Sequence, residues 1–330
     1  MTGLELSERY FFDCGLPVLR SHFPELAARC AAGLISTGSE VYGWDDSISR
    51  DHNWGPRFIL FLSDSDFQRQ GQAVQRVLDQ ELPREYAGTG IRRTGDAFPT
   101  SPAPVVTPAA SAKWNTGFPA APQDDRQWLA IPEHRLFEFT AGRIFHEPVP
   151  LITPIREAFA YFPDAVWRKR LSFAWFAASH CANVARTARR GDVLASHAYL
   201  AWGVECCARL VHLLNRRYAP FRKWLFHGLR LLPNLPTGLL QEMERAVTSV
   251  SLDQAQESLL RVLDSVGGLA NDAQLVPRQP LRVSRQDVFL PFNFEGSTTA
   301  FGATVTGPLK EMHPHDGPLD LRGSVFWFPR

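Results

Sequence analysis

A short polar loop between two apolar runs carries the first residues that could do chemistry: GLISTGSEVYGWDDSISRDHNWGPRFILFL, residues 33–62. Gly38 has no Cβ, so a phosphate can approach its backbone, and Ser39 adds a hydroxyl donor. Asp51 and Asn53 stand just before the second run, and on an extended segment they point to the same face. Such oxygens, opposite a phosphate-binding turn, could hold Mg²⁺ against a triphosphate. A plain polar loop in a sheet is the simpler alternative.

Composition and charge restrict the class of protein. The 330 residues include 35 basic and 34 acidic side chains, for a formal net charge of +1. Because phosphate contacts dominate nucleic-acid affinity, a protein that coats a polynucleotide carries a basic excess, and such a partner is disfavoured here. Five cysteines without a C-x-x-C motif indicate reduced core thiols and a cytoplasmic protein. The most apolar stretch, residues 171–185, is shorter than the ~20 residues of a membrane span, so no membrane partner is expected.

Hydrophobic periodicity predicts an α+β fold for the first half of the chain. Residues 1–32 and 67–81 have the spacing of amphipathic helices. Apolar runs typical of strands occupy residues 34–37, 58–62 and 136–145. We therefore expect a small mixed β-sheet surrounded by helices.

Two later regions differ in composition from this first half. Residues 97–123, AFPTSPAPVVTPAASAKWNTGFPAAPQ, hold too much proline for a central helix or strand and predict a loop, either a connector or a lid. The pattern from residue 154 to 265 is almost entirely helical and predicts a bundle of four or five helices. The expected organisation is a sheet domain at 1–150, an all-α helical bundle domain at 151–266 and an irregular C-terminal segment with short strands at 267–330.

The loop segment GSEVYGWDDSISRDHNWGPRFILFL resembles the nucleotidyltransferase superfamily of polymerase-beta-like folds, in which a Gly-Ser turn precedes a strand with an acid-x-acid pattern. With FTAGRIFHE, YFPDAVWRKRL and RRYAPFRKWLF, the chain is also similar, over roughly residues 30–235, to an uncharacterised bacterial family of predicted nucleotidyltransferases. That family has an Asp-His-Asp-Trp-Gly-Pro-Arg-type signature and a helical C-terminal domain. The resemblance implies a metal-dependent enzyme that transfers a nucleoside monophosphate, AMP from ATP, to a hydroxyl or amine of a small molecule.

The resemblance also implies roles for the residues of the loop. Gly38 and Ser39 would hold the β- and γ-phosphates, and Asp51 would be the first acid that binds Mg²⁺ or Mn²⁺. Position 53 departs from the family pattern, because Asn53 supplies a neutral oxygen where the family has a carboxylate. Another acid would have to compensate, or this member is catalytically impaired. The compensating candidates are Asp45, Asp46, Asp64, Asp66 and Glu147.

Two further acids could take part in the reaction. Glu147, which closes AGRIFHE, stands where the family places an acid, and Glu138 is the alternative on the same run. Either could instead be a solvated carboxylate at the end of a strand. Asp192 could take the proton of the acceptor if burial raises its pKa, or it could cap the helix that follows it.

The basic residues leave similar alternatives. Arg57 could contact a phosphate or pair with an acid, and Lys223 could neutralise the triphosphate or lie on a charged helix surface. His52 could touch a phosphate or brace Asp51. The expected partners are a nucleoside triphosphate and a small-molecule acceptor. A protein acceptor, as for a protein-modifying AMP transferase, and a nucleotide-binding protein without activity are the alternatives.

Overall fold

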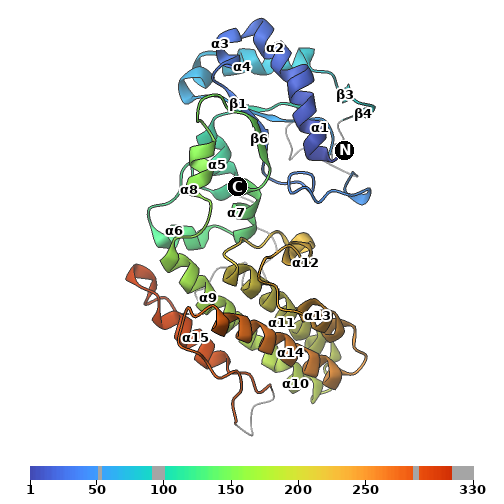
Figure 1. Cartoon of the computed structure of the whole chain (residues 1–330), viewed down its shortest axis with the longest axis vertical. Helices are drawn as coiled ribbons and strands as arrows, with labels where there is room; N and C mark the ends of the chain where they lie inside the picture. The colour runs from blue at the N-terminus through green and yellow to red at the C-terminus, as the bar shows by residue number, and fades with distance from the viewer. Residues whose placement is uncertain (51–53, 91–100, 285–289, 314–330) are drawn as a thin grey trace. The chain divides into compact units, whose positions relative to one another are not determined.

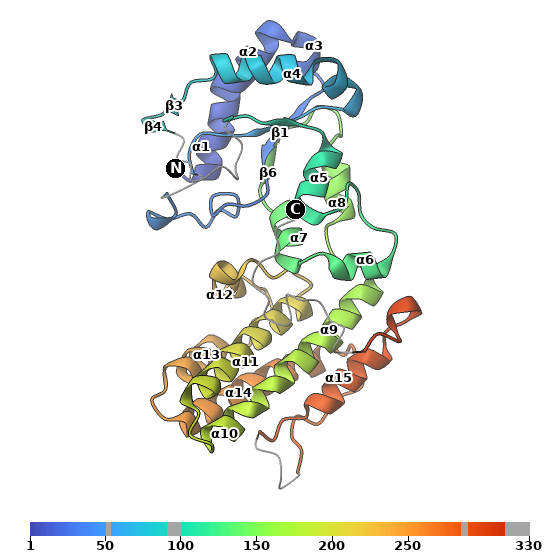
Figure 2. The ribbon, with the colours of Figure 1, turned by 180° about the vertical axis from the view of Figure 1, so that it is seen from behind.

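The structure is a computed structural model that describes residues 1–50, 54–90, 101–284 and 290–313. The chain forms two compact units, an α+β unit and a helical unit (Figures 1 and 2). The first comprises Met1–Ala121 and Arg135–Ala160, and the second comprises Pro122–His134 and the described residues from Tyr161 to His313. The α+β fold class predicted from the sequence is confirmed.

A four-stranded mixed sheet forms the centre of the first unit. Its strands are β1 Ala31–Leu34, β2 Ile59–Phe61, β5 Val105–Val106 and β6 Arg143–His146, in the spatial order β5-β2-β1-β6. The inner strand β1 pairs antiparallel with both β2 and β6, and β2 pairs parallel with β5. All four residues of β1 are buried, as expected for a central strand.

Short helices pack on this sheet and complete its hydrophobic core. They are α1 Gly3–Tyr10, a π-helical turn Phe11–Gly15, α2 Leu16–His22, α3 Pro24–Ala27 and α4 Asp64–Glu81. Tyr10 and Phe11 from the first helices meet Phe58 next to β2, and Val74 of α4 belongs to the same buried cluster. A small hairpin, β3 Glu85–Tyr86 and β4 Thr89–Gly90, follows α4.

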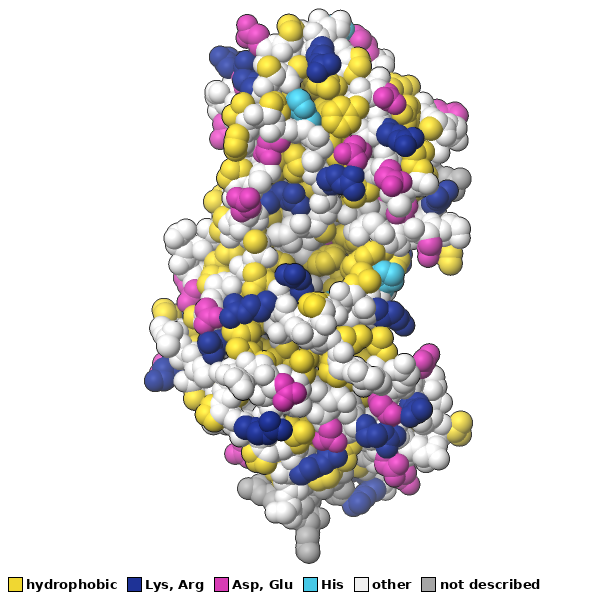
Figure 3. All heavy atoms as spheres, in the orientation of Figure 1, with side chains coloured by type: hydrophobic (Ala, Val, Ile, Leu, Met, Phe, Trp, Pro, Cys, Tyr) yellow, Lys and Arg dark blue, Asp and Glu magenta, His cyan; other side chains and the backbone are white. Residues whose placement is uncertain are grey.

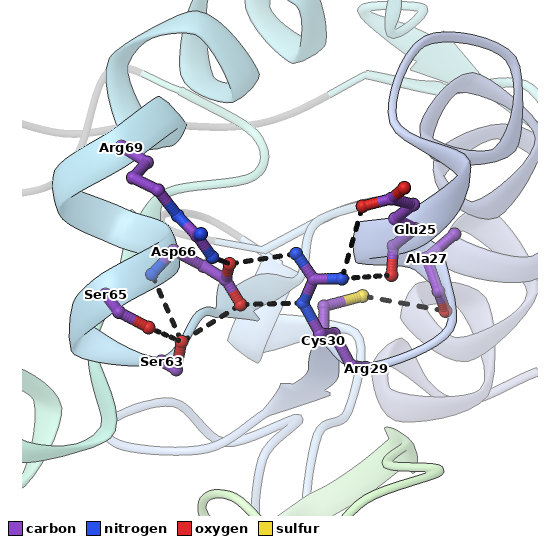
Figure 4. Close-up of polar contacts among 8 residues, drawn as sticks. All are labelled: Glu25, Ala27, Arg29, Cys30, Ser63, Ser65, Asp66 and Arg69. Atoms are coloured by element: carbon purple, nitrogen blue, oxygen red, sulfur yellow. Dashed lines mark hydrogen bonds and ion pairs between the residues drawn. The ribbon is translucent and has the colours of Figure 1, made fainter.

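The helix α4 is tied to the residues before β1 by the carboxylate of Asp66 (Figure 4). Arg29 binds both oxygens of Asp66, with Nε–Oδ2 and Nη2–Oδ1 distances of 2.9 and 3.0 Å. Arg69 and the hydroxyl of Ser63 donate to the same carboxylate. These hydrogen bonds, that of Arg29 first, hold the pKa of Asp66 well below its usual range although burial opposes them.

The Pro-rich segment is not the loop predicted for residues 97–123. Within its described part it supplies strand β5 and helix α5, Pro108–Thr116. Pro108 stands in the first turn of α5, where a missing N–H costs no helical hydrogen bond, and Thr107 caps the helix through Ala110 N. The prolines therefore delimit short elements and do not exclude them.

The strand predicted over residues 136–145 was also wrong in its first half. Helix α7, Glu133–Thr140, ends there and β6 begins only at Arg143. Between them Gly142 has φ +78°, and a Cβ at that position would lie 2.1 Å from the carbonyl oxygen of Leu34. Only glycine fits so close to β1, so the chain turns from helix to strand at this residue.

The helical unit contains α6 Asp125–Ala130, α9 Asp164–Ser179, α10 Asn183–Ala188, α11 Val193–Leu214, α12 Leu225–Leu229, α13 Leu239–Thr248, α14 Leu252–Asp272 and α15 Phe294–Ala303. The long helix α11 packs against α9, α10, α13 and α14. Across the described ranges, no helix has both the length and the apolarity that crossing a bilayer requires.

The organisation differs in two features from the expected sheet domain at 1–150, helical domain at 151–266 and irregular segment at 267–330. The units divide after Ala160, and helix α8, Thr153–Ala158, stays with the sheet. The segment expected to be irregular after residue 266 holds the end of α14 and all of α15, which Asn293 caps through Gly296 N. Because α15 packs along α9, this segment belongs to the helical unit.

The Asp66 network predicts how acid affects stability. A depressed carboxyl pKa contributes stability that is fully present above the ordinary pKa of Asp and is lost progressively as the pH falls from there toward the depressed pKa. Asp66→Asn should lower the free energy of unfolding by about 2 kcal/mol at pH 7, because it removes charge-assisted hydrogen bonds. The difference from the parent protein should shrink from pH 5 downwards in urea titrations.

Asp64→Asn is the matched control, because Asp64 lies exposed in the same first turn of α4. It should change the free energy of unfolding far less. A difference for Asp66→Asn that stays constant between pH 7 and pH 3 would contradict this account of the network.

Candidate functional site

The chain leaves β1 through a compact turn, residues 36–44, which we call the 36–44 turn. Ser36 and Gly38 have positive φ angles of 85° and 146°. Inside the turn the Val41 N–H donates to Gly38 O at 3.1 Å, and Trp44 N–H donates to Ser39 O at 2.9 Å. A non-glycine residue with positive φ costs on the order of 1–3 kcal/mol and is typical of functional sites. Ser36 thus marks this turn as a candidate site.

Two contacts hold Ser36 in this conformation. Its hydroxyl donates to Oδ1 of the buried Asn115 at 2.7 Å, and its N–H donates to the carbonyl oxygen of Glu138 at 3.1 Å. The turn is therefore anchored to both α5 and α7. Strand β1 spans Ala31–Leu34 and not the predicted 34–37, because the chain turns at Ser36, and the helix predicted to residue 32 ends at Ala27.

A buried carboxylate fills the space beside Gly38. A Cβ at Gly38 would lie 2.8 Å from the carboxylate oxygens of Glu40, whose residue is only 2% exposed. Glu40 forms an ion pair with Nη2 of Arg57. Arg57 therefore lies near the turn, as its proposed contact with phosphate requires, and its partner in this structure is an acid. Sequence reasoning missed Glu40, although its place directly after the Gly-Ser pair was a signal.

The acids that follow the turn have structural partners. Asp45 accepts hydrogen bonds from Gly3 N–H at 2.9 Å and from the Trp54 indole N–H at 3.0 Å. Asp46 accepts from the backbone N–H groups of Ile48 and Ser49, both at 2.9 Å. These contacts close the loop in front of β2 and make neither carboxylate a ready replacement for the acid missing at position 53.

Asp51, His52 and Asn53 lie outside the described residues. Both neighbours of this segment are described, and the guanidinium of Arg50 lies 4.5 Å from the centre of the Trp54 ring. Strands β1 and β2 are antiparallel, with Gly33 opposite Ile59. The end of β1 and the start of β2 therefore lie at the same edge of the sheet, and the connection that contains residues 51–53 begins and ends there.

Glu138 brings a second carboxylate to the 36–44 turn. The Tyr42 hydroxyl donates to its Oε1 at 3.4 Å, and Arg135 Nη1 lies 2.9 Å from its Oε2. Burial raises the pKa of Glu138 above its ordinary value, although Arg135, Tyr42 and Thr37 oppose the shift. Burial, followed by the Glu138 charge, likewise raises the pKa of Tyr42. A carboxyl whose pKa is raised by burial is a candidate for proton transfer.

Aromatic rings form one wall of this arrangement. Trp44 stacks on Phe137 with ring centres 5.5 Å apart and an interplanar angle of 29°, and Tyr42 meets Phe137 edge-on at 5.0 Å. The Phe137 ring thus fixes Tyr42 beside Glu138. Trp44 is partly exposed at the end of the turn.

The structure does not bring Glu147 to the turn. In the antiparallel pairing Leu34 lies opposite Arg143 and Ala32 lies opposite His146, so Glu147 follows the end of β6 that is distant from Gly38. Its carboxylate accepts hydrogen bonds from the N–H groups of residues 151–153 and from the Thr153 hydroxyl. These bonds outweigh the effect of burial and lower the pKa of Glu147. Glu147 thus binds the backbone at the start of α8 and does not lie beside the turn, and its role in catalysis stays a prediction.

The remaining candidates belong to other parts of the fold. Asp192 caps α11 through the Ala195 N–H at 3.0 Å and is exposed, so the burial that its role as a base required is absent. Lys223 is exposed in the 3-10 turn Arg222–Trp224, with Nζ 5.3 Å from the centre of the Trp224 ring. Asp64 is exposed in α4, and Asp66 is engaged by Arg29 and Arg69.

The carboxylates around the turn are oxygen ligands of the kind that Mg²⁺ prefers, but they do not form a complete metal site. Within the described ranges no group of three or more His, Cys, Asp or Glu side chains is arranged to hold a metal ion. Glu40 and Glu138 offer oxygen atoms, which Mg²⁺ prefers, and Glu40 is already paired with Arg57.

Comparisons with known proteins are sparse. Residues 128–225 match a family described as a domain of unknown function, DUF4037. No curated protein matches the chain. Among solved structures, a nucleotidyltransferase-like protein from Exiguobacterium sibiricum 255-15 is similar over 88% of this chain and 89% of its own, with 12% sequence identity and a TM-score of 0.35.

The contact between Gly38 and Glu40 predicts different effects for two glycines of the same turn. Gly38→Ala should cost both the strain of a positive φ and the displacement of the Glu40 carboxylate. Gly43→Ala should cost only strain, because nothing lies within 4 Å of its Cβ position. Urea denaturation should show a loss that is larger for Gly38→Ala by about 1 kcal/mol or more. Equal losses would contradict the close approach of Glu40.

Proposed function

We propose that the protein is a Mg²⁺-dependent nucleotidyltransferase that transfers AMP from ATP to a hydroxyl or amine of a small molecule. The observation that carries this proposal is the antiparallel pairing of β1 and β2, which puts the end of β1, where the 36–44 turn begins, and the start of β2 at one edge of the sheet. The partly exposed Ser39 lies there next to Gly38, which has a positive φ, and offers a hydroxyl donor for phosphate. The chain's resemblance to predicted nucleotidyltransferases points to the same segment.

In this proposal each residue near the turn has one task. Ser39 and the backbone at Gly38 bind the β- and γ-phosphates, and Arg57 exchanges Glu40 for a phosphate oxygen. Asp51 and Asn53 hold Mg²⁺, which when bound would withdraw charge from the phosphate under attack. The ring of Trp44, at the end of the turn, is the aromatic group proposed to contact the nucleobase, because aromatic rings stack on bases.

Glu138 takes the role of general base in place of the exposed Asp192. The acceptor oxygen attacks the α-phosphorus as the bond to pyrophosphate breaks, and Glu138 takes up the proton of the acceptor hydroxyl. Its raised pKa favours this uptake, and the contacts with Tyr42 and Arg135 orient its two oxygens. These properties support Glu138 as the general base more than Glu147 or Asp192, the two acids that the sequence favoured.

A small molecule suits this protein better than a polynucleotide as the acceptor. Lys and Arg side chains are interspersed with Asp and Glu over the face shown in Figure 3, in keeping with the net charge of +1. A nucleic-acid surface would gather one sign of charge along a groove or stripe. A protein acceptor is an alternative that the same assay can detect.

The second candidate function is nucleotide binding without transfer. It is favoured by Asn53, which lacks charge, together with the engagement of Asp45, Asp46 and Asp66 in contacts that position loops and helices. In that case the protein would bind ATP at the turn without transferring AMP, and its function would depend on the bound nucleotide.

The central test is Asp51→Asn. Transfer of label from α-³²P-ATP to a panel of small hydroxyl and amine acceptors should fall at least a hundredfold, because Asn cannot replace the charge of the metal ligand. Asp64→Asn, which changes an exposed carboxylate in α4, should leave transfer unchanged. Urea denaturation should show that both variants remain folded.

Three outcomes separate the candidate functions. Full activity of Asp51→Asn would overturn the assignment of the metal site. If calorimetry shows Mg²⁺-dependent ATP binding by the parent protein, yet no acceptor becomes labelled, the binding protein is the better description. The absence of ATP binding would rule out both.

A second prediction concerns pH. Because a base must be deprotonated, activity should be lost as the pH falls through the raised pKa of Glu138, at a pH above the ordinary value for Glu. Glu138→Gln should lower kcat by about 10²–10⁴ and remove this limb of the kcat profile. Glu147→Gln should reduce stability by loss of the cap on α8, and the profile should keep its shape. A profile that Glu138→Gln leaves intact would exclude Glu138 as the base.

A further inference from the structure

The helical unit contains a pocket of about 570 Å³ between α11, α13 and the segment of residues 222–230. Its apolar lining includes Trp202, Phe226, Leu240 and Met243. Two small residues of α11, Ala198 and Ala201, leave room along one side. The volume lies within the ~300–1,000 Å³ typical of small-molecule sites, which are mostly apolar and hold a few polar groups.

An ionic group is set into this apolar wall. Glu205 is only 9% exposed and lines the pocket together with Arg222. Its Oε1 accepts from Arg209 Nη2 at 3.0 Å, and its Oε2 forms an ion pair with Arg222. Charged groups are costly to desolvate in such surroundings. A protein with well-packed apolar residues in place of a buried ion pair is often as stable or more stable. Packing alone therefore gives no reason for three charged groups here.

The exposure of Arg222 indicates the sign of the ligand. Arg222 and Arg230 line the pocket with Glu205 and Glu244, and Arg209 shares Glu205 from behind. The lining itself thus holds two guanidinium groups and two carboxylates, and the charge of Glu205 is shared between Arg209 and Arg222. Glu205 holds Arg222 in place, and the side chain of Arg222 is 48% exposed, so its outer nitrogens can reach a ligand. Guanidinium groups bind carboxylates and phosphates with paired hydrogen bonds.

We propose that this pocket binds a small organic anion with an aromatic or otherwise apolar body. The body lies between Trp202, Phe226 and Met243, and the anionic group binds Arg222. Arg230, at the same pocket, adds long-range attraction. The proposal does not depend on nucleotidyl transfer, because every residue in it belongs to the helical unit.

The test uses two fluorescent probes of similar shape, the anionic 8-anilino-1-naphthalenesulfonate and the neutral N-phenyl-1-naphthylamine. The parent protein should bind the anionic probe at one site and at least tenfold more tightly than the neutral probe. Ala201→Trp should fill the pocket and weaken both probes at least tenfold. Gln254→Trp is the control, because Gln254 is exposed in α14 away from the pocket, and binding should not change.

Arg222→Gln separates the charge from the pocket. It should weaken the sulfonate probe about tenfold, the value of one charge-assisted hydrogen bond, and leave the neutral probe unchanged. Arg245→Gln, on an exposed part of α13 outside the pocket lining, removes one positive charge as a matched control. Circular dichroism melting identifies any variant that fails to fold, and Arg230→Gln then replaces Arg222→Gln with the same expected direction.

The proposal is overturned by any of three results. The first is equal affinity for the two probes. The second is binding of the sulfonate that Ala201→Trp does not weaken, which would place the probe elsewhere. The third is an equal loss in Arg222→Gln and Arg245→Gln, which would reflect net charge and no specific contact.

Discussion

The antiparallel pairing of β1 with both of its neighbours decides which side chains of the first unit can meet. Because β2 and β6 run opposite to β1, the edge where β1 ends is also where β2 and β6 begin. The 36–44 turn, the approach to β2 and the glycine turn before β6 share that edge. Residues at the end of β6 are carried to the other edge. This constraint excludes Glu147 from the turn and leaves α7, which precedes β6, to supply the carboxylate of Glu138.

Much of the first unit follows from local sequence pattern. The apolar runs around residues 34 and 60, the amphipathic helix that became α4 and the glycine turn between the strands were all predictable, because each depends on neighbouring residues. Register was not predictable. Whether Glu138 or Glu147 reaches the turn depends on where helix α7 ends and β6 begins, and Gly142 sets that point through a close approach to Leu34. No local pattern reports a contact between residues so distant in sequence.

The sequence places several acidic residues near a possible phosphate-binding turn, which suggested a metal site. In the structure most of these acids have structural partners. Asp45 joins the N-terminus of α1 to Trp54, Asp46 closes a short turn, and Asp66 links α4 to Arg29. Glu40, which the pattern did not single out, lies buried against Gly38. A sequence shows which side chains can bind cations, but hydrogen-bond partners decide which of them remain available.

The assignment of residues 122–134 to the helical unit has a consequence for dissecting the protein. The polypeptide passes from one unit to the other after residues 121, 134 and 160, so no single cut yields two complete parts. A fragment that stops at residue 160 would keep Trp128 and Ile131 but lose Phe162 and Arg170, against which they rest. Expressed alone, that fragment would expose the apolar side chains of residues 122–134 to solvent. Separation of the two units therefore also requires the removal of residues 122–134.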